Sequence, residues 1–255
     1  MNFSIVVPTY NSQEYLEECL QSIVKQKHDG GTQIIVVDNQ STDDTLNIAG
    51  EYKCQIICGK DKGEPDAINK GMRIASGNVV AFLDSDDIYE PDAFLKVEKH
   101  FYYNKVGWVY GKSYFIDEDG EKIRRLITDL KEILQRDYSY DKLCNLCFIA
   151  QPSVFMRRDF KDQIGDFNID YPLIFDYEYW LRAGQISDPS FISEYLSSMR
   201  AHSGSNSVKF STRQMRESLD LVYRFKKRNH YLSYSFRLGV LLLTIIYYKT
   251  VGRIL

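Results

Sequence analysis

Three carboxylates stand close together in the segment Asp84-Ser85-Asp86-Asp87, directly after the apolar run Val79–Leu83. Side chains of like charge at this spacing repel one another unless a cation lies between them. Mg²⁺ and Mn²⁺ prefer oxygen ligands, and they typically bind one or two protein carboxylates together with phosphate and water. The segment therefore predicts a divalent metal site that also takes a diphosphate. The alternative is an ordinary polar turn with a helix cap before Pro91.

Two further polar clusters also follow apolar runs. Pro8-Thr9-Tyr10-Asn11 follows Phe3–Val7, and Asp38 ends the run Gln33–Val37. In parallel sheets, ligands bind beyond the carboxyl ends of the strands, so we expect the three clusters to share one edge of a sheet. A carboxylate at Asp38 can accept an N–H from the edge of a nucleobase, whereas local turn and cap bonding by Asp38 or Ser41 is the alternative.

The spacing of apolar residues predicts the elements that hold these clusters. Four short apolar runs are expected as buried strands: Phe3–Val7, Gln33–Val37, Gln55–Cys58 and Val79–Leu83. Helices are expected between them, one with Leu16, Cys19, Leu20, Ile23 and Val24 on its inner face, one after the capping-box pattern Ser41–Asp44, and one from Pro65 to Ile74. This alternation predicts an α/β fold with a mostly parallel sheet between two layers of helices.

The pattern changes after a helix that should begin near Pro91. We expect a hairpin of Trp108–Ile116 with Lys122–Ile127, a strand at Gln151–Met156, and a helix over Tyr177–Arg182 with Tyr177, Trp180 and Leu181 inward. From Ser211 onward the chain should be helical. A second functional half therefore begins near residue 106.

Four segments, in this order, resemble motifs of the family-two glycosyltransferases. They are Ser4–Asn11, Val37–Thr45, Asp66–Gly71 and Phe82–Asp87, and the likeness is dense over residues 3–92 and thinner to about 208. The resemblance implies the GT-A fold and a nucleotide-sugar donor. It also implies a catalytic domain over 1–208, made of a nucleotide-sugar half (1–105) and an acceptor half (106–208), followed by a helical basic tail (209–255). The sequence departs from the family pattern in carrying Asn39 and Gln40 after Asp38.

The resemblance assigns roles position by position. It implies that the base and ribose are held by Pro8, Thr9, Tyr10, Asn11 and Asp38, and that Asp66 and Asn69 line the same pocket. Asp84, with Ser85, would meet the ribose. Asp86 would bind Mn²⁺ or Mg²⁺, and His202 could approach that metal or the diphosphate, although a loop histidine is often only solvated.

A general base is implied by the segment Phe175–Arg182, which is similar to an acidic family motif before a Trp-Leu-Arg sequence. Asp176 would take the proton from an acceptor hydroxyl as the oxygen attacks the anomeric carbon from the face opposite the diphosphate, which inverts the configuration. Glu178 is the rival base, and a helix cap by Asp176 is the structural alternative. The processive signature Gln-x-x-Arg-Trp is missing, so we expect one sugar to be added per encounter.

Charge is distributed unevenly along the chain. Residues 1–199 carry 21 Lys+Arg and 33 Asp+Glu, net −12, and residues 200–255 carry 11 and 2, net +9. Leu238–Tyr248 is nearly all apolar but too short to span a bilayer, so we expect an interfacial helix on anionic lipid or, equally, a core or homodimer helix. If the helix lies on lipid, we expect a cytoplasmic enzyme that is peripheral on the inner face of the plasma membrane. Its acceptor would then be a lipid-linked saccharide. The five cysteines form no even framework, which favours reduced thiols.

Two other functions share these features. A sugar nucleotidyltransferase has a similar sheet, but it would need a glycine-rich basic phosphate loop, and Pro8–Ser12 contains no Gly, Lys or Arg. A catalytically inactive nucleotide-sugar scaffold would bind the donor and recruit partners through the tail. Nucleic-acid binding by the tail is disfavoured, because its apolar stretch suits a membrane or protein surface better. The sequence favours a glycosyltransferase of cell-surface polysaccharide synthesis.

Overall fold

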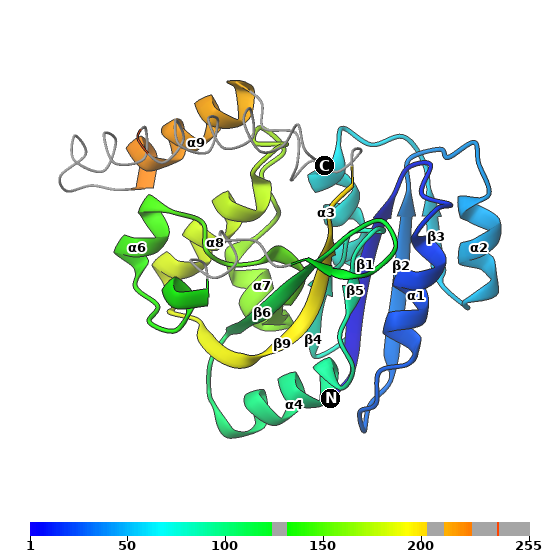
Figure 1. Cartoon of the computed structure of the whole chain (residues 1–255), viewed down its shortest axis with the longest axis horizontal. Coiled ribbons are helices and arrows are strands. Elements are labelled where there is room, and N and C mark those ends of the chain that lie inside the picture. Colours follow the sequence, from blue (N-terminus) through cyan, green and yellow to red (C-terminus); the bar gives the residue numbers. More distant parts are fainter. Residues whose placement is uncertain (124–131, 203–211, 226–238, 240–255) are drawn as a thin grey trace.

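The computed structural model describes residues 1–123, 132–202, 212–225 and 239. Within these residues, one sheet of nine strands crosses the molecule in the order β3-β2-β1-β4-β8-β6-β9-β5, with β7 paired to β6 (Figure 1). The sheet curls, and helices flank it on both faces (Figure 1). The fold is α/β with a mostly parallel first half, as the sequence predicts.

The first half of the chain forms a parallel unit. Its strands are β1 (Phe3–Thr9), β2 (Thr32–Asp38), β3 (Gln55–Cys58) and β4 (Val79–Phe82). Strand β1 pairs in parallel with β2 and β4, and β2 pairs in parallel with β3. The connecting helices are α1 (Leu16–Val24), α2 (Thr45–Glu51) and α3 (Glu64–Ile74). Because the strands are parallel, their carboxyl ends meet at one edge of the sheet.

Both faces of this sheet are buried. Along β1, Val6 belongs to the core beneath α3, whereas Ile5 and Val7 belong to the core beneath α1, and all three are fully buried. Successive strand residues point to opposite faces, so a strand covered on both sides must be apolar throughout. This explains why the sequence shows continuous apolar runs instead of alternation.

The second half continues the sheet with mixed directions. Its strands are β5 (Ile88–Tyr89), β6 (Trp108–Ile116), β7 (Lys122–Ile123), β8 (Val154–Arg157) and β9 (Ser190–Arg200). Its helices are α4 (Ala93–Tyr103), α6 (Tyr140–Asn145), α7 (Arg158–Ile164), α8 (Phe175–Ile186) and α9 (Thr212–Phe225), with a 3₁₀ turn, η1 (Gln151–Ser153), before β8. Strand β8 is antiparallel to both β4 and β6, and it joins the two halves into one sheet.

Several local predictions are confirmed and others are wrong. The hairpin forms up to Ile123, and residues 124–127 of its predicted second strand lie outside the described residues; Tyr177, Trp180 and Leu181 are buried as expected. Val24, predicted on the inner face of this helix, is instead 57% exposed; it is the last residue of α1.

The predicted capping box does not form. The Asp44 side chain does not cap α2, and the Asp43 carboxylate instead accepts bonds from the backbone N–H and the hydroxyl of Thr45. The predicted strand also begins three residues late, because Gln151–Ser153 form η1.

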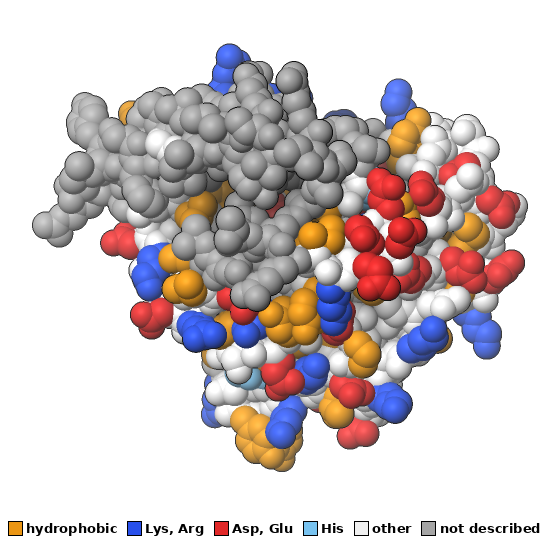
Figure 2. All heavy atoms as spheres, in the orientation of Figure 1, with side chains coloured by type: hydrophobic (Ala, Val, Ile, Leu, Met, Phe, Trp, Pro, Cys, Tyr) orange, Lys and Arg blue, Asp and Glu red, His pale blue; other side chains and the backbone are white. Residues whose placement is uncertain are grey.

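The acidic charge of the first 199 residues is visible on the surface. Figure 2 shows acidic side chains gathered on the side of the molecule where α1 and α2 lie, and Glu17 and Glu18 stand in the first turn of α1. The predicted helix at Leu238–Tyr248 lies outside the described residues, apart from Gly239. In the described part of the chain, no helix combines the length and the apolar character that a membrane span requires.

Candidate functional site

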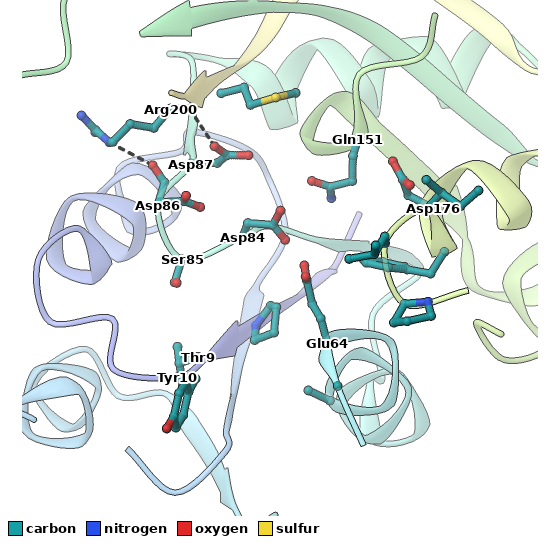
Figure 3. A pocket seen from close by; sticks show the side chains of 18 of the residues that line it. Thr9, Tyr10, Glu64, Asp84, Ser85, Asp86, Asp87, Gln151, Asp176 and Arg200 are labelled. Carbon is teal, nitrogen blue, oxygen red and sulfur yellow. Dashed lines mark hydrogen bonds between the residues drawn. The ribbon is translucent and has the colours of Figure 1, made fainter. Parts of the chain in front are cut away.

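A pocket of about 880 Å³ opens at the carboxyl ends of β1 and β4. Its walls come from the Pro8–Ser12 turn, the first turn of α3, the Asp84–Asp87 turn, η1, the beginning of α8, the end of β9 and one face of α9. Ligand pockets commonly have volumes of roughly 300–1,000 Å³. Figure 3 shows that Asp84, Glu64, Gln151 and Asp176 all extend into this space from different elements. Of the three sequence clusters expected at this edge, Pro8–Asn11 and Asp84–Asp87 line the pocket, and Asp38 reaches the same edge of the sheet in register with Thr9.

The three predicted carboxylates form the centre of one wall. Oxygens of Asp84, Asp86 and Asp87 all lie within 4.8 Å of one another. Asp87 is almost fully buried and accepts a hydrogen bond from the backbone N–H of Arg200 at 2.8 Å. The Oδ1 atom of Asp84 is buried and has no hydrogen-bond partner. A carboxylate oxygen in that condition is costly unless a ligand satisfies it.

The crowding of acidic groups shifts their protonation. Burial raises the pKa of Asp84 well above its usual value, and the negative charges of Glu64, Asp87 and Asp86 raise it further. Burial likewise raises the pKa of Asp87, and Arg200 only partly opposes this. Burial also raises the pKa of Glu64 to about 7, although a hydrogen bond to Asp84 opposes the rise. The acidic groups of this wall therefore oppose one another's ionisation.

Arg200 and His202 come from the end of β9 and hold the carboxylate turn in place. Arg200 is 1% exposed, and its Nε donates to the backbone oxygen of Asp86 at 3.0 Å. His202 Nε2 lies 2.9 Å from Asp86 Oδ2. The two residues predicted to bind metal, Asp86 and His202, are therefore in contact.

The turn after β1 lines the pocket with Pro8, Thr9, Tyr10 and Asn11, as predicted. Asn11 has a positive φ of 49°, and its side chain accepts a bond from the backbone N–H of Thr42 at 2.9 Å. Tyr10 is 63% exposed. An exposed aromatic ring beside a pocket offers a face on which a planar base can stack.

Asp38 is fully buried under this turn and is not among the residues that line the pocket. Its two oxygens accept bonds from the Thr9 hydroxyl and from the backbone N–H and hydroxyl of Ser41. The local turn bonding that the sequence left open is therefore present. Binding of a base by Asp38 stays a prediction.

Asp66 and Asn69 of α3 also lie away from the pocket lining. Asn69 is buried and exchanges two hydrogen bonds with the backbone of Phe167, which ties α3 to the second half of the chain. Asp66 pairs with Lys70 and accepts the backbone N–H of Lys62. Their predicted contact with a nucleotide remains untested.

Asp176 and Glu178 are placed differently. Asp176 lines the pocket, whereas Glu178 is 3% exposed and pairs with Arg182 at 2.9 Å. The residue at the N-cap of α8 is Ile174, so Asp176 stands inside the first turn and is not the cap. Ser85 also lines the pocket, where its hydroxyl donates to that of Ser12 at 2.9 Å.

Sequence reasoning missed several polar residues of the pocket, among them Glu64, Gln151, Gln214 and Ser218. Glu64 looks like an ordinary acidic residue at the beginning of a helix, and Gln151 looks like part of a strand. The Gln151 Nε2 donates to the backbone oxygen of Phe82, which leaves its Oε1 buried and unpaired. No signal in the sequence alone brings α9 to this pocket.

The sequence model described as Glycosyl transferase family 2 matches residues 4–165. Among similar proteins is the Escherichia coli UDP-Glc:alpha-D-GlcNAc-diphosphoundecaprenol beta-1,3-glucosyltransferase WfaP, 29% identical over 225 residues, which cover 84% of this chain and 83% of that protein. A PGL/p-HBAD biosynthesis glycosyltransferase of Mycobacterium bovis is 28% identical over 210 residues, covering 76% of this chain and 73% of that protein.

Two solved structures share the fold. Staphylococcus aureus TarS 1–349 in complex with UDP-GlcNAc superposes with a TM-score of 0.68 at 20% identity, covering 94% of this chain and 72% of that one. The mannosyltransferase PcManGT from Pyrobaculum calidifontis, in complex with GDP-Man and Mn²⁺, also gives a TM-score of 0.68, at 15% identity and with coverage of 96% and 75%. At these identities the likeness concerns the fold alone.

Proposed function

The chain belongs to glycosyl transferase family 2, and on that premise we propose that it is a metal-dependent, inverting enzyme that moves one sugar from a UDP-sugar to a saccharide carried on a lipid. The observation that carries the proposal is the arrangement of the pocket. A cluster of three carboxylates stands on one wall, and Asp176 stands among the residues of the opposite side (Figure 3).

The carboxylate wall fits a hard divalent cation. Its three carboxylates are hard oxygen donors that lie within reach of one ion. Asp84 Oδ1, which is buried without a partner, is free to accept a hydrogen bond from a bound ligand. Asp86 and His202 would hold the ion, and Asp84 with Ser85 would contact the ribose. When bound, Mn²⁺ or Mg²⁺ supplies positive charge that stabilises the diphosphate leaving group.

The chemical step needs a base on the other side of the sugar. Asp176 would accept the proton of the acceptor hydroxyl while that oxygen attacks the anomeric carbon, and the bond to the diphosphate would break on the far side. Attack and departure on opposite faces invert the configuration. The turn Pro8–Asn11 would hold the base and ribose, with Tyr10 stacking on the base.

The relatives support the choice of donor and acceptor. WfaP is described as using UDP-Glc and a diphosphoundecaprenol-linked GlcNAc, and TarS was solved with UDP-GlcNAc. A lipid-linked acceptor of the same kind would place this chain in cell-surface polysaccharide synthesis, on the cytoplasmic face of the membrane. Addition of a single sugar agrees with the missing processive signature.

The test is UDP or GDP release, in the presence of a synthetic GlcNAc diphospholipid as acceptor, from a panel of donors: UDP-glucose, UDP-GlcNAc, UDP-galactose and GDP-mannose, each with Mn²⁺ and with EDTA. We expect release from at least one UDP-sugar with Mn²⁺ and none with EDTA. Release in EDTA would overturn the metal dependence. No release from any donor would favour the inactive scaffold.

A further inference from the structure

The helix α9 contributes a wall of the pocket although it lies beyond the part of the chain that the family model matches. Figure 1 shows α9 over the second half of the chain, where it packs against α6, far along the sequence from the strands that carry the carboxylates. Leu221 of α9 is fully buried in the core that also contains Trp180 and Tyr177. The helix is therefore packed into the fold, and its position relative to the pocket is fixed.

The first contact of α9 is with the segment that leads into α8. Glu217 is 8% exposed, and its Oε2 accepts the backbone N–H of Leu173 at 3.3 Å. Arg213 pairs with the other oxygen of Glu217 at 2.9 Å. Leu173 lines the pocket and lies three residues before Asp176. Glu217 thus holds the backbone that delivers the proposed base.

A second contact holds the same segment one turn further along α9. The Tyr171 hydroxyl donates to Asp220, and Arg224 donates to that hydroxyl at 3.1 Å. The Arg224 guanidinium also lies over the Tyr171 ring, 5.8 Å from its centroid. The segment 171–173 is therefore anchored at both ends to α9.

Two uncharged polar residues of α9 face the pocket. Gln214 and Ser218 are four residues apart, which places them on one face of the helix, and both line the pocket beside Pro172 and Leu173. An amide and a hydroxyl each offer a hydrogen-bond donor and an acceptor. Groups of this kind match the hydroxyls of a sugar and carry no charge to attract a diphosphate.

We propose that α9 is the acceptor-recognising wall of the pocket: Gln214 and Ser218 contact the incoming saccharide, and Glu217 is a positioning residue that holds the 171–176 segment. This rests on the proposed function. The acceptor must approach Asp176, and α9 packs directly against the segment that carries it. The carboxylate cluster and the Pro8–Asn11 turn occupy the other walls, where the donor would bind.

The test compares Glu217→Ala with Glu217→Gln in two measurements: UDP release from the preferred donor with a synthetic GlcNAc diphospholipid as acceptor, and Mn²⁺–UDP affinity by calorimetry. Alanine removes the acceptor of the Leu173 N–H, whereas glutamine keeps an oxygen there. We expect Glu217→Ala to lower the kcat of UDP release at least tenfold with UDP affinity within twofold, because small displacements of a catalytic group cost rate. Glu217→Gln should have a kcat within threefold of the wild type. Arg216→Ala, on the exposed side of the same helix, is the matched control.

A second readout uses a synthetic GlcNAc diphospholipid as the acceptor probe. The double variant Gln214→Ala with Ser218→Ala should raise the KM for this probe at least fivefold. Tyr171→Phe removes only one hydroxyl and serves as the second positioning variant in case Glu217→Ala is too unstable to assay. It should also lower kcat with UDP affinity unchanged, but by a smaller factor. Unchanged kcat in both Glu217→Ala and Tyr171→Phe, or loss of UDP affinity together with kcat in these variants, would overturn the inference. Failure of the wild type to bind Mn²⁺–UDP would instead overturn the proposed function and this inference with it.

Discussion

Replacing Glu64 by glutamine should change how the stability of the metal-free protein depends on pH. Burial raises the pKa of Glu64 to about 7 from its usual 4.5. Between these values the folded protein holds a proton that the unfolded chain has released. Stability therefore falls as pH rises through this window and levels off above it. At about 1.36 kcal/mol for each pKa unit, the resulting loss in the free energy of unfolding is about 3 kcal/mol, and the partial exposure of Glu64 makes it smaller.

The assay is urea unfolding in EDTA at pH 5, 6, 7 and 8. The free energy of unfolding of Glu64→Gln, minus that of the wild type, should grow by up to about 3 kcal/mol between pH 5 and pH 8. Asp66→Asn, on the same helix, is the control. Burial raises the pKa of Asp66, but the backbone N–H of Lys62 and the Lys70 ammonium lower it by more, so the net pKa lies below its usual value. The effect of Asp66→Asn on stability should therefore be constant over this pH range. A constant difference for Glu64→Gln as well would refute the reasoning that Glu64 is buried against Asp84.

Three further substitutions test other parts of the account. Asp176→Asn should lower kcat for transfer by about 10²–10⁴-fold, the range typical of a lost general base, with UDP affinity unchanged; equal loss of both would mark Asp176 as structural. Glu178→Gln should lower the melting temperature, because it breaks a buried pair with Arg182, but should leave most of kcat; a loss as large as that of Asp176→Asn would favour the rival base. Gly71→Ala should cost about 1–3 kcal/mol in urea unfolding, because its Cβ would lie 2.4 Å from Val6, whereas Gly50→Ala, with open space around it, should cost nothing.

The sequence predicts the first half of the fold well because each part of the signal there is local. A strand such as Phe3–Thr9 is apolar throughout and ends at a polar turn, and the helix that follows has a clear inner face. The parallel sheet then follows from the alternation alone. The position of Asp84 and Asp86 at the end of a buried strand follows for the same reason, whereas the presence of Asp176 in the same pocket was expected only from the family resemblance.

The rest depends on contacts that are distant in the chain. Strand β9 was not predicted, because Ser190–Arg200 is half polar and buries Ser197, Ser198 and Arg200 through bonds to other elements. The pairing of β8 between β4 and β6 has no local signature either. The role of α9 depends on single bonds, such as that from Leu173 to Glu217, which only the folded chain brings together.

The central claim is that the carboxylate wall and the neighbouring turn bind a divalent cation together with a nucleotide diphosphate. Calorimetric titration of UDP, with Mn²⁺ and with EDTA, tests it most directly when the wild type is compared with Asp86→Ala. We expect the wild type to bind UDP at least tenfold more tightly with Mn²⁺ than with EDTA, and Asp86→Ala to lose that difference. Equal UDP affinity in Mn²⁺ and EDTA for the wild type would contradict the account.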